Sequence, residues 1–202
     1  MRYPDFFDAV PGIRLRDPLA DFLGAAADGI IEYSYLDAVK LAGHSCPTVA
    51  SAYWLTRRAL HALYGDRLPE RCGVRVEFAA NVAEGVTGVI ANVVSMLTGA
   101  AGEGGFKGLA GRFERRRLLS FDGELPLEVR YTRLDGQGQI NAAAFPGRVP
   151  ADPEMGALMQ RCLSGLADAT EIRQFGALWQ ERVRRILLEH GADDAVFVVR
   201  AA

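Results

Sequence analysis

The chain has 202 residues, of which 50% are hydrophobic and 24% are charged, and its formal net charge is −2. This is the composition of a globular protein with a sizeable core, and the charge gives no bulk electrostatic reason to expect nucleic acid or an acidic membrane as a partner. The three cysteines are far apart and form no CxxC pair, which excludes a disulfide framework and a zinc finger of the CxxC type.

No apolar run approaches the ~20 residues of a membrane-spanning helix. The first residues, MRYPDFFDAVPG, also lack the basic and apolar regions of a signal peptide. We therefore expect a protein of the reducing cytoplasm, folded as a single domain over residues 1–202.

The N-terminal quarter predicts short elements. The first dozen residues contain two prolines and predict an extended arm. Asp17 and Pro18 are typical of an N-cap and a first helical position, and the helix is expected to continue to about Ala26. A short strand is expected over 29–34, followed by a short helix over 35–41 that Gly43 ends.

The centre of the chain predicts two helices around one strand. Apolar residues recur at helical spacing over 47–64, whereas 74–80 alternates with a period of two and indicates a strand. Residues 85–97 are β-branched, but their length and small residues favour a buried helix. The following segment, 99–111, has six glycines in thirteen positions.

The remainder predicts a block of strands and then two helices. Strands are expected over 113–121, 125–134 and 139–145, and DGQG at 135–138 is a hairpin signal. Helices are expected over 153–163 and 170–190, before a final strand in the tail AVFVVR. Helices at both ends of a strand block predict an α+β fold, with an antiparallel sheet packed with helices.

The stretch LAGHSCPTVA, residues 41–50, places His44 and Cys46 directly before a helix that begins at Pro47. Pro47 at the first helical position makes Cys46 the N-cap, where unpaired N–H groups and the helix dipole stabilise a thiolate. In extended backbone, side chains two residues apart point the same way, so His44 and Cys46 are candidates to converge on one metal ion. The alternative is that neither residue belongs to a functional site: the cysteine is simply buried, and the histidine caps the helix or forms a hydrogen bond.

A zinc site needs at least a third protein ligand. Glu84, before the glycine that precedes the second buried helix, is the best candidate, although capping of that helix explains Glu84 equally well. His61 and His190 are expected on the surface or at a helix end, and Cys72 and Cys162 as core thiols. Glu84 therefore completes the expected ligand set of His44, Cys46 and Glu84.

The glycine-rich segment matches neither the GxGxxG pattern nor a P-loop. Lys107 and Arg112 within and just after it are candidates to hold an anionic ligand. A flexible connector with ordinary surface cations is the alternative.

The order of these features resembles a known family. GHSCP, the following helix, the VEF strand, a second helix ending in Leu97-Thr98-Gly99, and the loop with Phe106-Lys107 are similar to the FmdE family, which takes its name from a component of formylmethanofuran dehydrogenase. The resemblance covers residues 35–121, leaving 122–202 as a hairpin and C-terminal helical extension. It implies an α+β core, a homodimer and a metal-associated cleft lined by the motif His and Cys.

The chain departs from the family pattern at several positions. Ala42 replaces the first motif histidine, and Thr48 replaces the glycine after Cys-Pro. Val89 and Asn92 stand where members carry a cysteine and an aspartate in the second helix. Of the family's site residues, His44 and Cys46 are therefore present unchanged, and Asn92 is a polar residue in place of the family's aspartate. We assign Asn92, Lys107 and Arg112 to substrate binding.

Three functions follow from these residues. The first is an FmdE-like protein that binds a divalent transition metal, zinc above others, at His44 and Cys46, and that uses it as a Lewis acid or to activate water if it is an enzyme. The second is a metal-free reactive-cysteine or redox protein with Cys46 as the thiolate. The third is a structural or regulatory module that binds partners through its C-terminal helix and hairpin.

Overall fold

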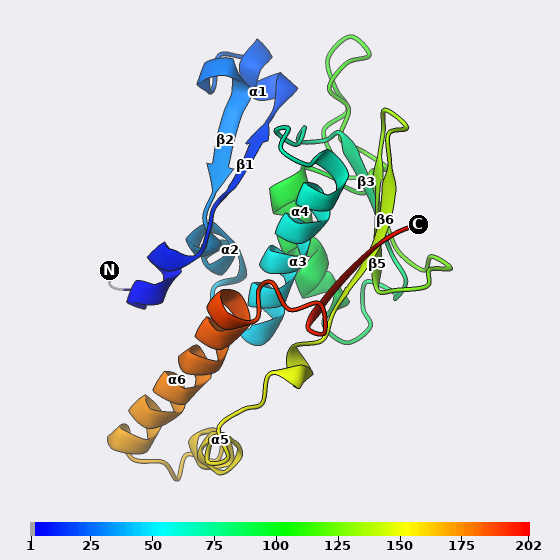
Figure 1. Ribbon diagram of the computed structural model, residues 1–202. Coiled ribbons are helices and arrows are strands. Elements are labelled where there is room, and N and C mark those ends of the chain that lie inside the picture. Colours follow the sequence, from blue (N-terminus) through cyan, green and yellow to red (C-terminus); the bar gives the residue numbers. More distant parts are fainter. Residues whose placement is uncertain (1–2) are drawn as a thin grey trace.

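Helices pack against a mainly antiparallel sheet in the computed structural model, which describes residues 3–202, and this confirms the predicted α+β class (Figure 1). The helices are α1 (Pro18–Phe22), α2 (Tyr35–Ala42), α3 (Pro47–Tyr64), α4 (Thr87–Thr98), α5 (Met155–Leu163) and α6 (Ala169–Arg184). The single helical turns are η1 (Asp5–Ala9), η2 (Ala27–Gly29), η3 (Pro146–Arg148) and the π-helical η4 (Arg185–Glu189). The strands are β1 (Ile13–Arg16), β2 (Ile30–Tyr33), β3 (Val74–Phe78), β4 (Leu119–Ser120), β5 (Val129–Arg133), β6 (Gln139–Ala144) and β7 (Phe197–Ala201).

The larger sheet has the order β4-β3-β5-β6-β7, and all its neighbours are antiparallel except β3 and the two-residue β4. The predicted turn between β5 and β6 is confirmed, and Gly136 and Gly138 adopt the positive φ angles that such a turn needs. The tail forms β7 on the edge of β6, also as predicted. The hairpin of β1 and β2 stands apart from this sheet (Figure 1).

The central helix α3 is the middle of the core. Its bounds match the prediction, with Cys46 as N-cap, Pro47 at the first position and Gly65 just after the last turn. The helix contacts α2, α4, η4 and the strands β6 and β7, which explains why most of its residues are buried. The buried hydrophobic cluster runs from Phe7 near the N-terminus to Phe197 in β7.

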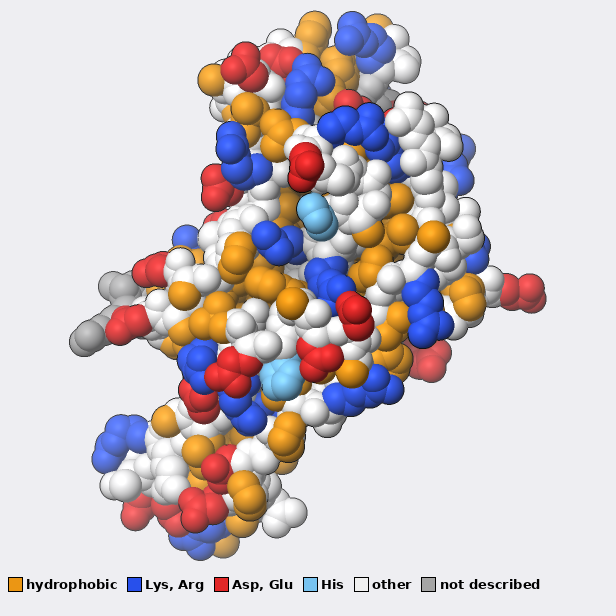
Figure 2. All heavy atoms as spheres, viewed as in Figure 1, with side chains coloured by type: hydrophobic (Ala, Val, Ile, Leu, Met, Phe, Trp, Pro, Cys, Tyr) orange, Lys and Arg blue, Asp and Glu red, His pale blue; other side chains and the backbone are white. Residues whose placement is uncertain are grey.

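The face of the molecule drawn in Figure 2 has no single dominant charge. Lys and Arg side chains are interspersed with Asp and Glu over the face in Figure 2, as the small net charge suggests. Within residues 3–202, no helix combines the length and apolarity that crossing a bilayer demands.

The N-terminal segment differs from its prediction. Residues expected to form an extended arm contain η1, because the Phe7 side chain is buried edge-on against Tyr35, with ring centroids 5.0 Å apart. Strand β1 was not predicted and pairs with β2. Helix α1 has the predicted Asp17 cap but ends at Phe22 rather than Ala26, just before Gly24 with its left-handed φ of 67°.

The predicted strand over 113–121 is wrong except for the two residues of β4. Phe113 and Arg117 have φ angles of 62° and 59°, which no β-strand contains. The cause is long-range: the Arg115 side chain between them reaches back to Asp17 and fixes an irregular backbone.

Asp17 joins segments that are distant in the sequence. Its carboxylate caps α1 by accepting from the Leu19 and Ala20 N–H groups. It also accepts from Arg71 Nη1 at 2.9 Å and from Arg115 Nη2 at 2.8 Å. Burial by itself would raise the pKa of Asp17, but these hydrogen bonds and charges together lower it below its usual value.

We predict that Asp17→Asn lowers the free energy of unfolding at neutral pH by about 2–4 kcal/mol, because two guanidinium groups lose their buried counter-charge. Chemical denaturation measures this. Since the folded-state pKa is lowered, the contribution of Asp17 is complete above its unfolded pKa near 4 and disappears as the pH falls through the lower folded value. The stabilities of wild type and variant should therefore converge in acid.

Asp21→Asn is the matched control in the same helix. Asp21 pairs with Arg16 on the exposed surface, so its substitution should change the stability by less than about 1 kcal/mol. Equal losses for the two variants would contradict the role of Asp17.

Candidate functional site

The loop between α2 and α3 is fixed at both ends by local signals. Gly43 adopts a left-handed φ of 77° and its N–H closes α2 on the Val39 carbonyl. Cys46 is extended and caps α3, whose first residue is Pro47. His44 and Ser45 are therefore held between two helix ends (Figure 1).

Two helices, the distant α6 and the preceding α2, hold this loop at Ser45. The Ser45 carbonyl accepts from Trp179 Nε1 at 3.0 Å and from Gln180 Nε2 at 3.1 Å, both in α6. The Ser45 hydroxyl lies 2.9 Å from the Tyr35 hydroxyl of α2. No short-range pattern marks Trp179 or Gln180 as positioning residues, because their partner is a backbone atom far away in the sequence.

His44 is exposed and oriented by its own loop. Its Nδ1 lies 2.9 Å from the Ala42 carbonyl oxygen. A carbonyl oxygen can only accept, so Nδ1 carries the hydrogen and, in the neutral ring, Nε2 keeps its lone pair.

A pocket of about 170 Å³ separates this loop from α4. Its lining residues are Leu41, Ala42, His44, Val89, Asn92 and Val93. The structure thus brings His44 and Asn92 together, as two polar groups in an otherwise apolar pocket. Within residues 3–202 the exposed Asn92 side chain has no hydrogen-bond partner.

Cys46 does not line this pocket. As predicted, it is the N-cap of α3, and its sulfur accepts from the Val49 N–H at 3.5 Å. The residue is only 8% exposed and belongs to the hydrophobic core. The capping bond keeps the sulfur above the first turn of α3, whereas His44 is at the surface.

Glu84 lies in the exposed turn before α4 and does not line the pocket. The alternative assignment of Glu84 as a helix cap is wrong, because Val86 is the N-cap of α4 and no side chain within residues 3–202 caps this helix. Its main chain forms the turn instead, with its carbonyl accepting from Thr87 N–H. No group of three or more His, Cys, Asp and Glu side chains within residues 3–202 is placed to hold a metal ion.

Lys107 and Arg112 do not line the His44 pocket either. Lys107 is exposed in the glycine-rich loop, and Arg112 lines a different pocket. Two glycines of this loop allow close backbone contacts: a Cβ on Gly108 would lie 2.3 Å from the Arg112 carbonyl oxygen, and one on Gly105 would lie 2.9 Å from the Arg115 carbonyl oxygen.

No protein-family model matches the chain, and no curated protein matches it. The FmdE resemblance therefore remains a prediction.

The burial of Cys46 predicts slow chemical labelling. In the native protein, alkylation of Cys46 should be slower than that of the half-buried Cys162 of α5, and the two should react similarly after unfolding. Mass spectrometry of tryptic peptides at successive times measures both rates. Faster native labelling of Cys46 than of Cys162 would instead support the metal-free reactive-cysteine function.

Proposed function

We propose that the protein is FmdE-like and binds a divalent transition metal, zinc above others, in the pocket between the His44 loop and α4. One observation carries this proposal. The two α4 positions that the resemblance pairs with the motif, Val89 and Asn92, line the same pocket as His44. The positions of Val89 and Asn92 in the sequence do not by themselves indicate that they lie near His44.

The orientation of His44 supports the same assignment. A metal-bound histidine usually donates its other ring N–H to a carbonyl or carboxylate, which fixes the ring and the tautomer. The Nδ1–H of His44 and the Ala42 carbonyl have this relation. Asn92 adds an amide oxygen, which binds a divalent metal ion less strongly than a carboxylate does.

The pocket offers two protein donors, one fewer than the three of a catalytic zinc site, so the binding that we expect is weak. Zinc takes four ligands, and catalytic sites leave a position for water or substrate. Here His44 and Asn92 are the donors, and Val89 stands where the family has a thiolate. A bound ion would supply Lewis-acid chemistry. The chain itself orients the imidazole through Ala42, and Val89 and Val93 give the pocket apolar walls.

Metal titration tests the proposal. We expect His44→Ala to weaken zinc binding by at least about tenfold, as loss of a nitrogen ligand should, and Asn92→Ala to weaken it less. His61→Ala is the matched control, because His61 is an exposed histidine of α3 outside this pocket. Equal affinity of wild type and His44→Ala, or an equal loss in His61→Ala, would refute the site.

A gain of binding is a second and sharper test. Val89→Cys restores a thiol at the family position inside the pocket and should tighten zinc binding by at least about tenfold. Val86→Cys adds the same thiol to the exposed start of α4, outside the pocket, and should not. In the cobalt form, a sulfur-to-metal charge-transfer band should appear in Val89→Cys and be absent from wild type. A band in the wild type that Cys46→Ser removes would instead make Cys46 a ligand.

The third function, an interaction module, is favoured by one observation. The helices α5 and α6 project from the sheet (Figure 1), and Leu163, Leu166 and Ile172 near their connection are 81%, 70% and 54% exposed. We propose that a second copy of this chain covers these exposed apolar residues, in keeping with the expected homodimer. We also propose the reducing cytoplasm as the compartment of the protein.

Sedimentation tests the dimer. We expect Leu166→Glu to raise the dimer dissociation constant by at least about tenfold, because it places a charge in a buried contact. Phe145→Glu, at an exposed hydrophobic residue elsewhere, should leave the constant unchanged. A monomeric wild type, or a dimer that Leu166→Glu leaves intact, would contradict the proposed interface.

A further inference from the structure

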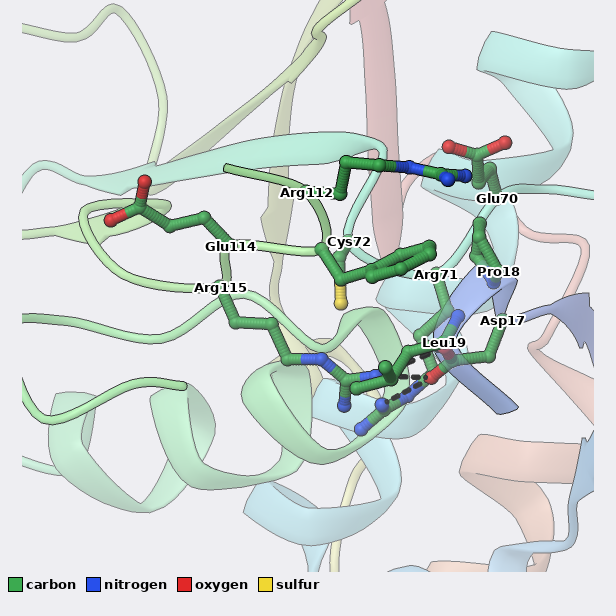
Figure 3. Close-up of a pocket in the computed structure, with 10 residues that line it drawn as sticks. Asp17, Pro18, Leu19, Glu70, Arg71, Cys72, Arg112, Glu114 and Arg115 are labelled. Atoms are coloured by element: carbon green, nitrogen blue, oxygen red, sulfur yellow. Dashed lines mark hydrogen bonds and ion pairs between the residues drawn. The ribbon is translucent and has the colours of Figure 1, made fainter. Parts of the chain in front are cut away.

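A second pocket, of about 340 Å³, shares no residue with the His44 pocket (Figure 3). It lies between the start of α1, the turn before β3 and the irregular segment after the glycine-rich loop. Its lining residues are Asp17, Pro18, Leu19, Glu70, Arg71, Cys72, Arg112, Phe113, Glu114 and Arg115. Its volume is within the range of small-molecule sites, about 300–1,000 Å³.

The buried ion cluster in its wall is positively charged. One carboxylate, Asp17, is shared by Arg71 and Arg115, so these three groups carry a formal charge of +1. Glu114 does not cancel this charge, because it pairs with Arg116 outside the pocket. The cluster therefore favours an anion beside it.

Several N–H donors around the pocket have no acceptor within residues 3–202. Arg71 Nε is buried without a hydrogen-bond partner. Arg115 donates to Asp17 through Nη2 alone, so its Nε and Nη1 groups have no acceptor within residues 3–202. The guanidinium of Arg112 forms no ion pair with the described residues and lies over the Phe113 ring, 4.7 Å from its centroid.

The remaining wall is apolar and strained. Pro18, Leu19 and the Phe113 ring provide flat hydrophobic surface. Cys72 and Phe113 both adopt left-handed backbone, with φ angles of 66° and 62°. Such angles are costly for side chains with a Cβ and persist where the surroundings enforce them, frequently at binding sites.

We propose that this pocket binds a small organic anion with a flat apolar body, of the aromatic carboxylate class. The spare N–H groups of Arg112 and Arg115, which lie on either side of Cys72 in Figure 3, donate to the carboxylate. The apolar part of the ligand packs on Phe113 and Leu19. Glu70 also lines the pocket, has no ion pair within residues 3–202, and opposes the anion.

Benzoate is the probe, and benzamidinium, of the same shape but opposite charge, is its control. In titrations followed by two-dimensional NMR, we expect saturable binding of benzoate and none of benzamidinium at the same concentration. Arg112→Ala should weaken benzoate binding by about tenfold, the loss of charged hydrogen bonds. Glu70→Gln should tighten it by about twofold or more, because a nearby like charge is removed.

Arg117→Ala is the matched control. Arg117 belongs to the same segment but pairs with Glu103 on the exposed surface and does not line the pocket. The benzoate affinity of the Arg117→Ala variant should equal that of the wild type. No saturable benzoate binding, equal binding of benzamidinium, or an equal effect of Arg112→Ala and Arg117→Ala would overturn the proposal.

Cys72 locates the bound probe. Burial raises the pKa of the Cys72 thiol, against the opposing charges of Arg115 and Arg71, so alkylation is measured at mildly alkaline pH. Saturating benzoate should slow alkylation of Cys72 and leave that of Cys162, a half-buried thiol in α5, unchanged. Equal rates at Cys72 with and without benzoate would place the ligand elsewhere and overturn the assignment.

Discussion

The carboxylate of Asp17 is the interaction on which the arrangement around it depends. Alone, a buried charge is costly, and here it is offset by two helix N–H groups and two guanidinium groups. Arg71 also donates to the Met96 carbonyl of α4. One carboxylate thus connects the N-terminal hairpin, the turn before β3 and the segment after the glycine-rich loop, and through Arg71 it connects them to α4. Backbone hydrogen bonds of Arg16 with Pro69 and Arg71, and a ring contact of Phe22 with Phe113, join the same segments, and the ion cluster adds its charge pairing to them.

This cluster also explains where the sequence predicted the fold well and where it did not. The helix that begins at Pro47 and the turn before Gln139 follow from local chemistry: a cap, a proline, or glycines with the required φ. The helix over 85–97 was predicted from its length and small residues, although its β-branched side chains would also suit a strand. The segment 113–121 was expected to be a strand, but the Arg115 side chain pairs with Asp17, which is far away in the sequence. Local propensity cannot include that contact.

The candidate site divides in the same way. The N-cap position of Cys46 is a local property and was predictable, whereas the burial of its sulfur depends on the packing around the start of α3. The proximity of His44 and Asn92 depends on how α2 packs on α4. Only the family resemblance suggested it, by assigning Val89 and Asn92 to the motif. The pocket beside Asp17 has no sequence motif, since ten residues from three segments line it.

Most residues of the motif have a structural explanation that requires no ligand. Gly43 takes the left-handed angle that ends α2, Cys46 caps α3, and Pro47 begins it. Gly99 ends α4 in the same conformation, and a Cβ there would lie 2.4 Å from the Cys72 sulfur. The fold alone therefore accounts for these residues. His44 differs from them: it is exposed, and within residues 3–202 the only hydrogen bond of its side chain joins Nδ1 to the Ala42 carbonyl oxygen at the end of α2. Within the motif, we therefore propose His44 as the residue that binds a ligand, together with Asn92 of α4 in the same pocket.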